Sequence, residues 1–146
     1  MRIRRAELGE IEDVAALAVQ LFPDRDVDEV FSDLILALTG RSAIVWLAEE
    51  DGQPIGYALC RLHHEDVKGT ESKPVGYLEA VYVLPEHRRQ GIGRRLVQVC
   101  ETWTKDKKDC TELASDCRVT APEALAFLTK LGFIEVDRIV CVNKRL

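Results

Sequence analysis

The sequence predicts an α/β fold over residues 1–146, with a mixed β-sheet covered by helices on both faces. Three observations predict this class. A length of 146 residues suits one domain. A hydrophobic content of 47% can fill a core, while 31% charged residues give a water-facing surface. Segments with strand and helix periodicity follow one another with no repeat, linker or low-complexity stretch between them.

The first half of the chain opens with a predicted edge strand over Arg2–Arg5. A helix is expected over Glu10–Phe22, because its apolar residues fall on one stripe, and Pro23 ends it. A second helix is expected from an Asp26 N-cap through Thr39, followed by Gly40. Two helices therefore precede the main part of the sheet.

The middle of the chain predicts three strands. Ser42–Glu49 and Pro54–Leu62 flank the Asp51-Gly52 pair, a strong signal for a tight hairpin. The polar segment from His63 to Pro74 has no periodicity and is expected to be a loop. Tyr77–Val83 is rich in β-branched and aromatic residues and forms the third of these strands.

The last third predicts helix, strand, helix and strand. A helix runs from Leu96 to Lys107, and a short strand follows over Glu112–Cys117. The T-x-x-E pattern of Thr120–Glu123 predicts a capping box that opens a helix ending at Gly132. The apolar stretch Phe133–Lys144 predicts one long strand, or two strands with a kink.

The stretch between the third strand and the following helix predicts an anion site. Gly91 and Gly93 precede the helix, and their missing side chains would let a phosphate oxygen approach its first N–H groups. Arginines 88, 89, 94 and 95 surround them. The P-loop pattern and the third glycine of the dinucleotide fingerprint are absent. An ordinary loop with a solvated basic helix is the alternative interpretation.

Charge and cysteine usage narrow the function classes. A net charge of −5 argues against broad nucleic-acid binding and suits a cationic substrate. The chain has no apolar run of membrane-spanning length and no signal-peptide pattern at Met1–Arg5, so we expect a cytoplasmic protein without membrane partners. Five cysteines without a C-x-x-C pair favour reduced thiols, and His63, His64 and His87 lack metal-ligand spacing, so no metal site is expected.

Several motifs together carry a family resemblance. Arg88-Arg89-Gln90-Gly91-Ile92-Gly93, after a strand that ends Tyr-Val-Leu-Pro, resembles the acetyl-CoA-binding motif of the GCN5-related N-acetyltransferase (GNAT) superfamily. Leu131-Gly132-Phe133 is similar to the closing motif of that family. Three segments resemble bacterial aminoglycoside 6'-N-acetyltransferases, namely residues 77–83, 112–116 and 140–146.

The resemblance implies a fold, a co-substrate and a set of binding residues. The sheet would be mostly antiparallel, with the central parallel strands Tyr77–Val83 and Glu112–Cys117 splayed apart to admit acetyl-CoA. The residues implied for acetyl-CoA are Val81, Tyr82, Val83, Arg88, Arg89, Gln90, Gly91, Ile92, Gly93 and Arg94. Acetyl-CoA would serve as a co-substrate, and the Val81 N–H would stabilise the oxyanion.

Two acidic residues are the candidates for the acceptor side. Glu79 lies within an apolar strand, where a carboxylate is costly to bury, and matches the acceptor-site glutamate of the aminoglycoside enzymes. We expect it to bind the amine and to act as the catalytic base. Asp116 matches the subfamily's sugar-binding aspartate. The alternatives are a solvent-facing glutamate and a turn aspartate, and the acidic turn of Asp24, Asp26 and Asp28 is expected to be solvated.

The pattern departs from the family in the last expected helix. Ala121 and Leu128 stand where many relatives have asparagine and a tyrosine general acid, so no general acid is assigned. The expected function is transfer of acetyl to a primary amine, preferably the 6'-amino group of an aminoglycoside. Other small amines, or a non-catalytic acyl-CoA-binding regulator, are the alternatives. The apolar tail Ile139–Val142 predicts pairing or exchange with a second subunit in a homodimer.

Overall fold

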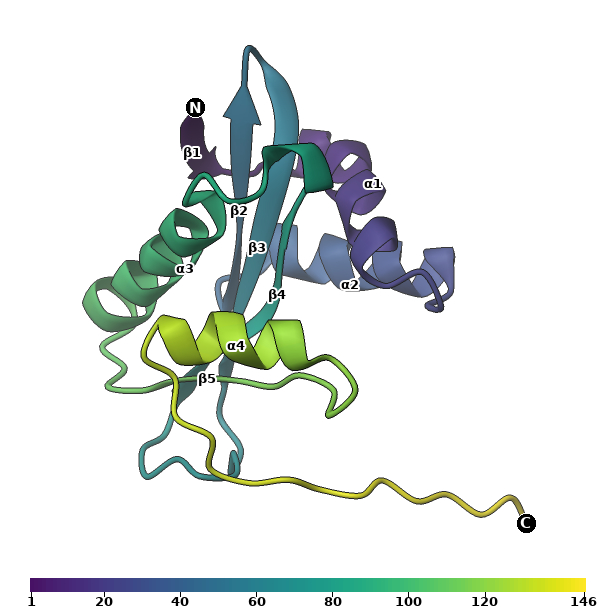
Figure 1. The fold of residues 1–146 in the computed structure, drawn as a ribbon, viewed down its shortest axis with the longest axis vertical. Coiled ribbons are helices and arrows are strands. Elements are labelled where there is room, and N and C mark those ends of the chain that lie inside the picture. The colour runs from purple at the N-terminus through teal and green to yellow at the C-terminus, as the bar shows by residue number, and fades with distance from the viewer.

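A computed structural model describes residues 1–146, and its strands form one five-stranded sheet in the order β1-β2-β3-β4-β5 (Figure 1). The first four strands are antiparallel neighbours, and β4 and β5 are parallel. The predicted mixed, mostly antiparallel sheet is therefore confirmed. The strands are β1 (Arg2–Arg5), β2 (Ala43–Glu50), β3 (Gln53–His63), β4 (Val75–Val83) and β5 (Leu113–Ser115).

Helices cover both faces of this sheet, as expected. Figure 1 shows α1 and α2 on one side and α3 on the other, with α4 beside the end of the sheet that carries β5. The helices are α1 (Ile11–Leu21), α2 (Val27–Thr39), α3 (Ile92–Thr102) and α4 (Pro122–Lys130), with short turns η1 (Leu8–Glu10) and η2 (Pro85–His87) and a π-helical segment η3 (Trp103–Lys107). None of these helices is long and apolar enough to cross a membrane.

Each face of the sheet has its own hydrophobic core. On the α1 and α2 side, Val14, Leu34 and Tyr57 are almost fully buried. On the α3 and α4 side, Leu96, Cys100 and Leu128 are buried against the opposite face of the strands. Two cores on one sheet hold β3 and β4 rigidly, which makes their backbone a suitable support for a functional site.

Local signals explain most element ends. Asp51 and Gly52 have φ values of 51° and 77°, as a two-residue hairpin turn requires, so that prediction is confirmed. Gly132 has φ of 99° and ends α4, also as predicted. Asp26 does precede α2, but its side chain makes no capping hydrogen bond.

Two predictions at the end of the chain are wrong. The capping box of Thr120–Glu123 does not form, because Ala121 occupies the N-cap position and Pro122 begins α4. The predicted strand over Phe133–Lys144 is absent. Phe133 packs against the α3 and α4 side, Asp137 forms an ion pair with Lys68, and the chain then runs away from the body in an extended form (Figure 1). A strand needs a hydrogen-bonded neighbour, and no backbone hydrogen bond joins residues 134–146 to a strand.

Candidate active site

The site is built around a gap between β4 and β5. These parallel strands pair only at Gly76, Tyr77 and Leu78, which lie opposite Leu113, Ala114 and Ser115. The Ser115 hydroxyl donates to the Leu78 carbonyl at 2.9 Å and fastens the last pair. Beyond it β5 has ended, while β4 continues to Val83. The edge of β4 from residue 79 onward therefore has no neighbouring strand, which is the predicted splay.

The backbone of this open edge offers hydrogen-bonding groups. The Leu84 N–H bonds the Ile55 carbonyl of β3 at 2.8 Å, so Leu84 and Tyr82 direct their backbone groups toward β3. Because successive residues of a strand alternate in this respect, Val81 and Val83 direct theirs toward the gap. An extended ligand in the gap could pair with Val81 as an added strand would.

A free helix N-terminus lies next to the end of β4. The first backbone bond of α3 runs from the Arg95 N–H to the Gly91 carbonyl at 3.1 Å, so the N–H groups of Ile92, Gly93 and Arg94 have no backbone partner. Such a terminus binds anions. Gly91 is its N-cap and has φ of 79°, a conformation that favours glycine, with open space where a side chain would stand.

Gly93 has a packing role in addition to the one that the sequence suggested. A Cβ atom there would lie 3.2 Å from two ring atoms of Phe127 on α4. The missing side chain thus lets α4 pack against the first turn of α3. The spacing of the two glycines predicts close approach of a phosphate, but it does not reveal the packing between α3 and α4.

The arginines around the turn divide into two kinds. Arg88 donates from Nε to the Val83 carbonyl at 2.8 Å, and its guanidinium lies 5.3 Å from the centre of the Tyr82 ring. It ties the turn to the end of β4 and occupies the Val83 carbonyl. Arg89, Arg94 and Arg95 are exposed and form no ion pair within the chain, so their charges are available to a bound anion.

Glu79 lies where β4 leaves its regular register. Leu59 pairs with Ala80 and Cys60 pairs with Leu78, so Glu79 is the extra residue of a β-bulge. A bulge redirects a side chain, and such bulges are common beside active sites. The Glu79 side chain is 31% exposed, which places it between the buried and the solvent-facing positions that the sequence left open.

Two basic side chains of β3 hold the Glu79 carboxylate. His63 Nε2 lies 2.8 Å from Glu79 Oε1, and Arg61 Nε lies 3.6 Å from the same oxygen. Glu79 Oε2 accepts no hydrogen bond from the chain. Sequence reasoning missed Arg61 and left His63 without a role. Their i, i+2 spacing puts both on one face of a strand, but only the register with β4 shows that they reach Glu79.

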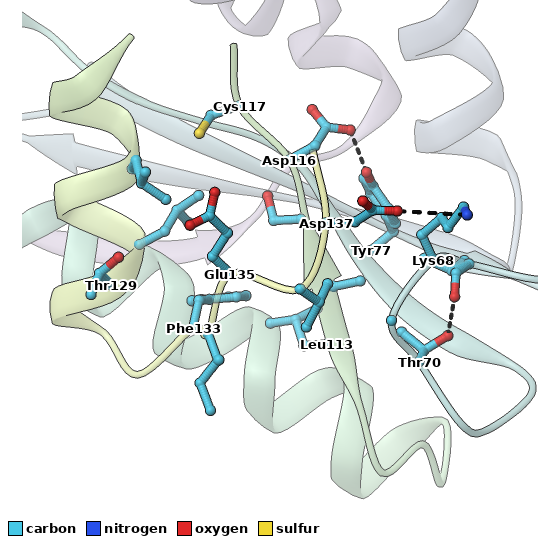
Figure 2. Close-up of a pocket in the computed structure, with 18 of the residues that line it drawn as sticks. Lys68, Thr70, Tyr77, Leu113, Asp116, Cys117, Thr129, Phe133, Glu135 and Asp137 are labelled. Atoms are coloured by element: carbon cyan, nitrogen blue, oxygen red, sulfur yellow. Dashed lines mark hydrogen bonds and ion pairs between the residues drawn. The ribbon is translucent and has the colours of Figure 1, made fainter. Parts of the chain in front are cut away.

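Asp116 joins the same group of side chains from β5. It follows the last residue of β5, is exposed, and accepts a hydrogen bond from the Tyr77 hydroxyl (Figure 2). Burial raises the pKa of the Tyr77 phenol, and the bond to Asp116 raises it further, so this hydroxyl stays a donor near neutral pH. The Tyr77 and His63 rings are stacked, with their centres 4.5 Å apart.

The remaining candidates of the sequence lie apart from this group. Leu128 is only 8% exposed and packs in the core between the sheet and α4, so it offers no polar group to a ligand. The acidic turn before α2 is exposed. Cys60, Cys100 and Cys110 are buried, and Cys141 is exposed on the tail. No three His, Cys, Asp or Glu side chains are arranged as a metal site.

Comparison with known proteins adds a family to this geometry. Residues 9–133 match the acetyltransferase (GNAT) family. The chain belongs to the GNAT acetyltransferase family. The turn at Gly91, the splayed strands and Glu79 all lie within the matched region, and the predicted relationship is confirmed. The chain is thus an acyltransferase of this family.

Several relatives of this GNAT chain have a more specific name. It is 40% identical over 139 residues to an aminoglycoside N(6')-acetyltransferase type 1 of Stenotrophomonas maltophilia, covering 94% of this chain and 89% of the relative. It is 34% identical over 146 residues to one from Acinetobacter haemolyticus, covering 100% and 99%. The solved structure of AAC(6')-Iy with the bisubstrate analogue CoA-S-monomethyl-acetylneamine matches with a TM-score of 0.92 and 30% identity, covering 99% and 98%.

Proposed function

We propose that this chain transfers the acetyl group of acetyl-CoA directly to the 6'-amino group of an aminoglycoside in a ternary complex. The observation that carries the proposal is the pairing of two features on β4. Glu79, with Asp116 nearby through Tyr77, supplies negative charge at one end of the open edge. The free N-terminus of α3 supplies anion-binding N–H groups at the other. The negative end suits a cationic acceptor, and the anion-binding end suits the pyrophosphate of the acetyl donor.

Acetyl-CoA would lie along the open edge of β4. Its pyrophosphate suits the N–H groups of residues 92–94, with Arg89 and Arg94 adding charge. The Val81 backbone would pair with the pantetheine arm and donate its N–H to the oxyanion. Arg88 and Tyr82 would support this edge rather than contact the ligand, because Arg88 bonds Val83 and the Tyr82 hydroxyl donates to Gln20 of α1 at 2.9 Å.

Glu79 would perform the proton transfer. The acceptor arrives as an ammonium ion, which the Glu79 carboxylate attracts and then deprotonates, directly or through water. The amine nitrogen attacks the thioester carbonyl, the C–S bond breaks, and coenzyme A leaves as a thiolate. The nitrogen must still lose a second proton, which passes through water to this thiolate. Asp116 would bind another amino group of the sugar. Leu128 supplies no proton to the thiolate, so the mechanism uses no general acid from α4.

A coenzyme A release assay with two matched antibiotics tests the acceptor. Neomycin and paromomycin differ at the 6' position, which carries an amine in the first and a hydroxyl in the second. We expect thiol release with neomycin and none above background with paromomycin. Equal release with both would mean that another amine is acetylated. Tight acetyl-CoA binding without release across polyamines, amino acids, peptides and aminoglycosides would favour a regulator instead.

We further propose that the chain, as a single N-acetyltransferase domain in the cytoplasm, works as a homodimer that exchanges its tail. β5 is an edge strand with no neighbour on its outer side. A groove runs along it, lined by Leu113, Cys117, Thr129 and Phe133 (Figure 2). Ile139, Val140 and Val142 of the tail are 66 to 90% exposed. An apolar strand without a neighbour and a free strand edge are complementary, so a partner's tail would complete the sheet.

A further inference from the structure

The mechanism above leaves one close contact of Glu79 unused, namely that with His63 at the end of β3. His63 Nε2 and Glu79 Oε1 are 2.8 Å apart, and both side chains are about one-third exposed. The His63 ring is held in place by its stacking on Tyr77. An imidazole fixed at this distance donates a hydrogen bond to one carboxylate oxygen and leaves the other free.

We propose that His63 is a positioning residue for Glu79, and that it works only as the neutral imidazole. The Nε2–H fixes Oε1, so that Oε2 is directed to the acceptor amine. A protonated His63 would place a second positive charge beside Arg61 at the same carboxylate. That charge would repel the cationic acceptor and make Glu79 a poorer base. The inference rests on the proposed role of Glu79 as the base.

The effect of a charge on His63 can be measured separately from the charges of the groups around it. Arg61, Tyr77, Glu79 and Asp116 face it directly or through the stacked ring. Arginine keeps its charge, and histidine is the side-chain type suited to a charge change between neutral and mildly acidic pH. Between pH 5.5 and 8 the acceptor's own amines also titrate, but they do so equally in every variant. His64 is exposed and makes no bond to Glu79, so it provides a matched control.

The experiment measures kcat and the KM for neomycin from pH 5.5 to 8.5 in variants of His63 and His64. His63→Gln keeps a donor without a titrating ring, and His63→Phe keeps the ring without a donor. At pH 8 we expect His63→Phe to lose about ten-fold or more in kcat, the value of one charged hydrogen bond, while His63→Gln stays closer to the wild type. Between pH 8 and pH 5.5 the wild-type KM should rise by about ten-fold more than that of His63→Gln.

Four outcomes distinguish a failure of the His63 proposal from a failure of the Glu79 proposal. Wild-type kcat in His63→Phe at pH 8, or an unchanged acid rise of KM in His63→Gln, would overturn the role of His63. If His64→Gln lost the acid rise of KM, then His64 and not His63 would cause that rise, and the proposed role of His63 would be overturned as well. Full activity of Glu79→Gln would instead remove the base on which the inference rests. Acetyl-CoA affinity and thermal midpoints measured for each variant show whether the fold is intact.

Discussion

Gly91 and Arg88 show how differently two neighbouring residues of one motif contribute. Gly91 adopts φ of 79° at the start of α3, and a β-branched residue there strains the turn that carries the N–H groups. Arg88 instead donates to the Val83 carbonyl and lies beside Tyr82. Backbone geometry should therefore matter more to pyrophosphate binding than this side chain does.

We expect Gly91→Val to raise the KM for acetyl-CoA by about ten-fold or more, the equivalent of the 1–2 kcal/mol cost of a left-handed conformation. Arg88→Ala should raise it less, because α3 keeps its N-terminus. Initial rates at varied acetyl-CoA concentration check both variants. A larger effect of Arg88→Ala than of Gly91→Val would show that the side chain, and not the backbone, holds the pyrophosphate.

The position of Glu79 in the site could be predicted from the sequence only in part. Its place in an apolar strand marked it as a candidate, and the structure puts it at the open edge of β4 beside His63. The bulge that directs its side chain could not be predicted, because a bulge depends on the pairing of β4 with β3. The link from Tyr77 to Asp116 likewise joins strands that are far apart in the sequence.

At the scale of elements, Arg4 fastens β1 to its neighbours. Its guanidinium bonds both oxygens of Glu10 at the end of η1, and its Nε lies 3.2 Å from Glu49 of β2. These bonds lower the pKa of the Glu10 carboxyl, with the hydrogen bond from Arg4 as the largest cause. A carboxyl with a lowered pKa in the fold stabilises it above its unfolded pKa, and the contribution is lost as pH falls through the folded value.

We expect Glu10→Gln to lower the free energy of unfolding at pH 7 by about 1 kcal/mol, since the Arg4 and Glu10 side chains, 29% and 22% exposed, are partly screened by water. The difference from the wild type should shrink as pH falls toward 3, because Glu10 of the wild type then becomes protonated as well. Urea unfolding at both pH values measures this. A stability difference between the two proteins that grows as the pH falls would contradict this prediction.

Most elements could be predicted because their signals are local. Hydrophobic stripes, the Asp51-Gly52 turn and Gly132 place the helices and the hairpin to within a few residues. β5 is shorter than predicted, because its pairing with β4 stops where the two strands splay after Ser115. Splaying is a property of two strands together, so the residues of β5 alone carried no sign of it.

At the scale of the whole molecule, the contacts within one chain do not explain why the C-terminal tail is apolar. Residues 133–146 form no strand, and Val140 is 88% exposed. The same residues have the apolar character of a buried strand. The sequence predicted a strand from that character, and the prediction is wrong for the single chain, in which residues 134–146 pair with no strand. Exchange between two copies would pair the tail with the free edge of the partner's β5.

We expect the protein to have twice its monomer mass of 16.4 kDa by light scattering at micromolar concentration. Val140→Asp should shift it to the monomer, because a charge would be buried in the exchanged strand. Leu36→Asp changes another exposed apolar residue, on α2, and should leave the dimer intact. A monomeric wild type would rule out the exchange, and a dimer broken only by Leu36→Asp would move the interface to α2.

The central claim is that Glu79 takes the proton from the acceptor amine at an edge where acetyl-CoA binds independently of it. The most direct test compares Glu79→Gln with the wild type in two measurements, acetyl-CoA affinity by calorimetry and the rate of coenzyme A release with neomycin. We predict unchanged affinity and a rate lower by about 100-fold or more, the usual value of a general base. A Glu79→Gln protein that transfers acetyl at the wild-type rate would contradict the account.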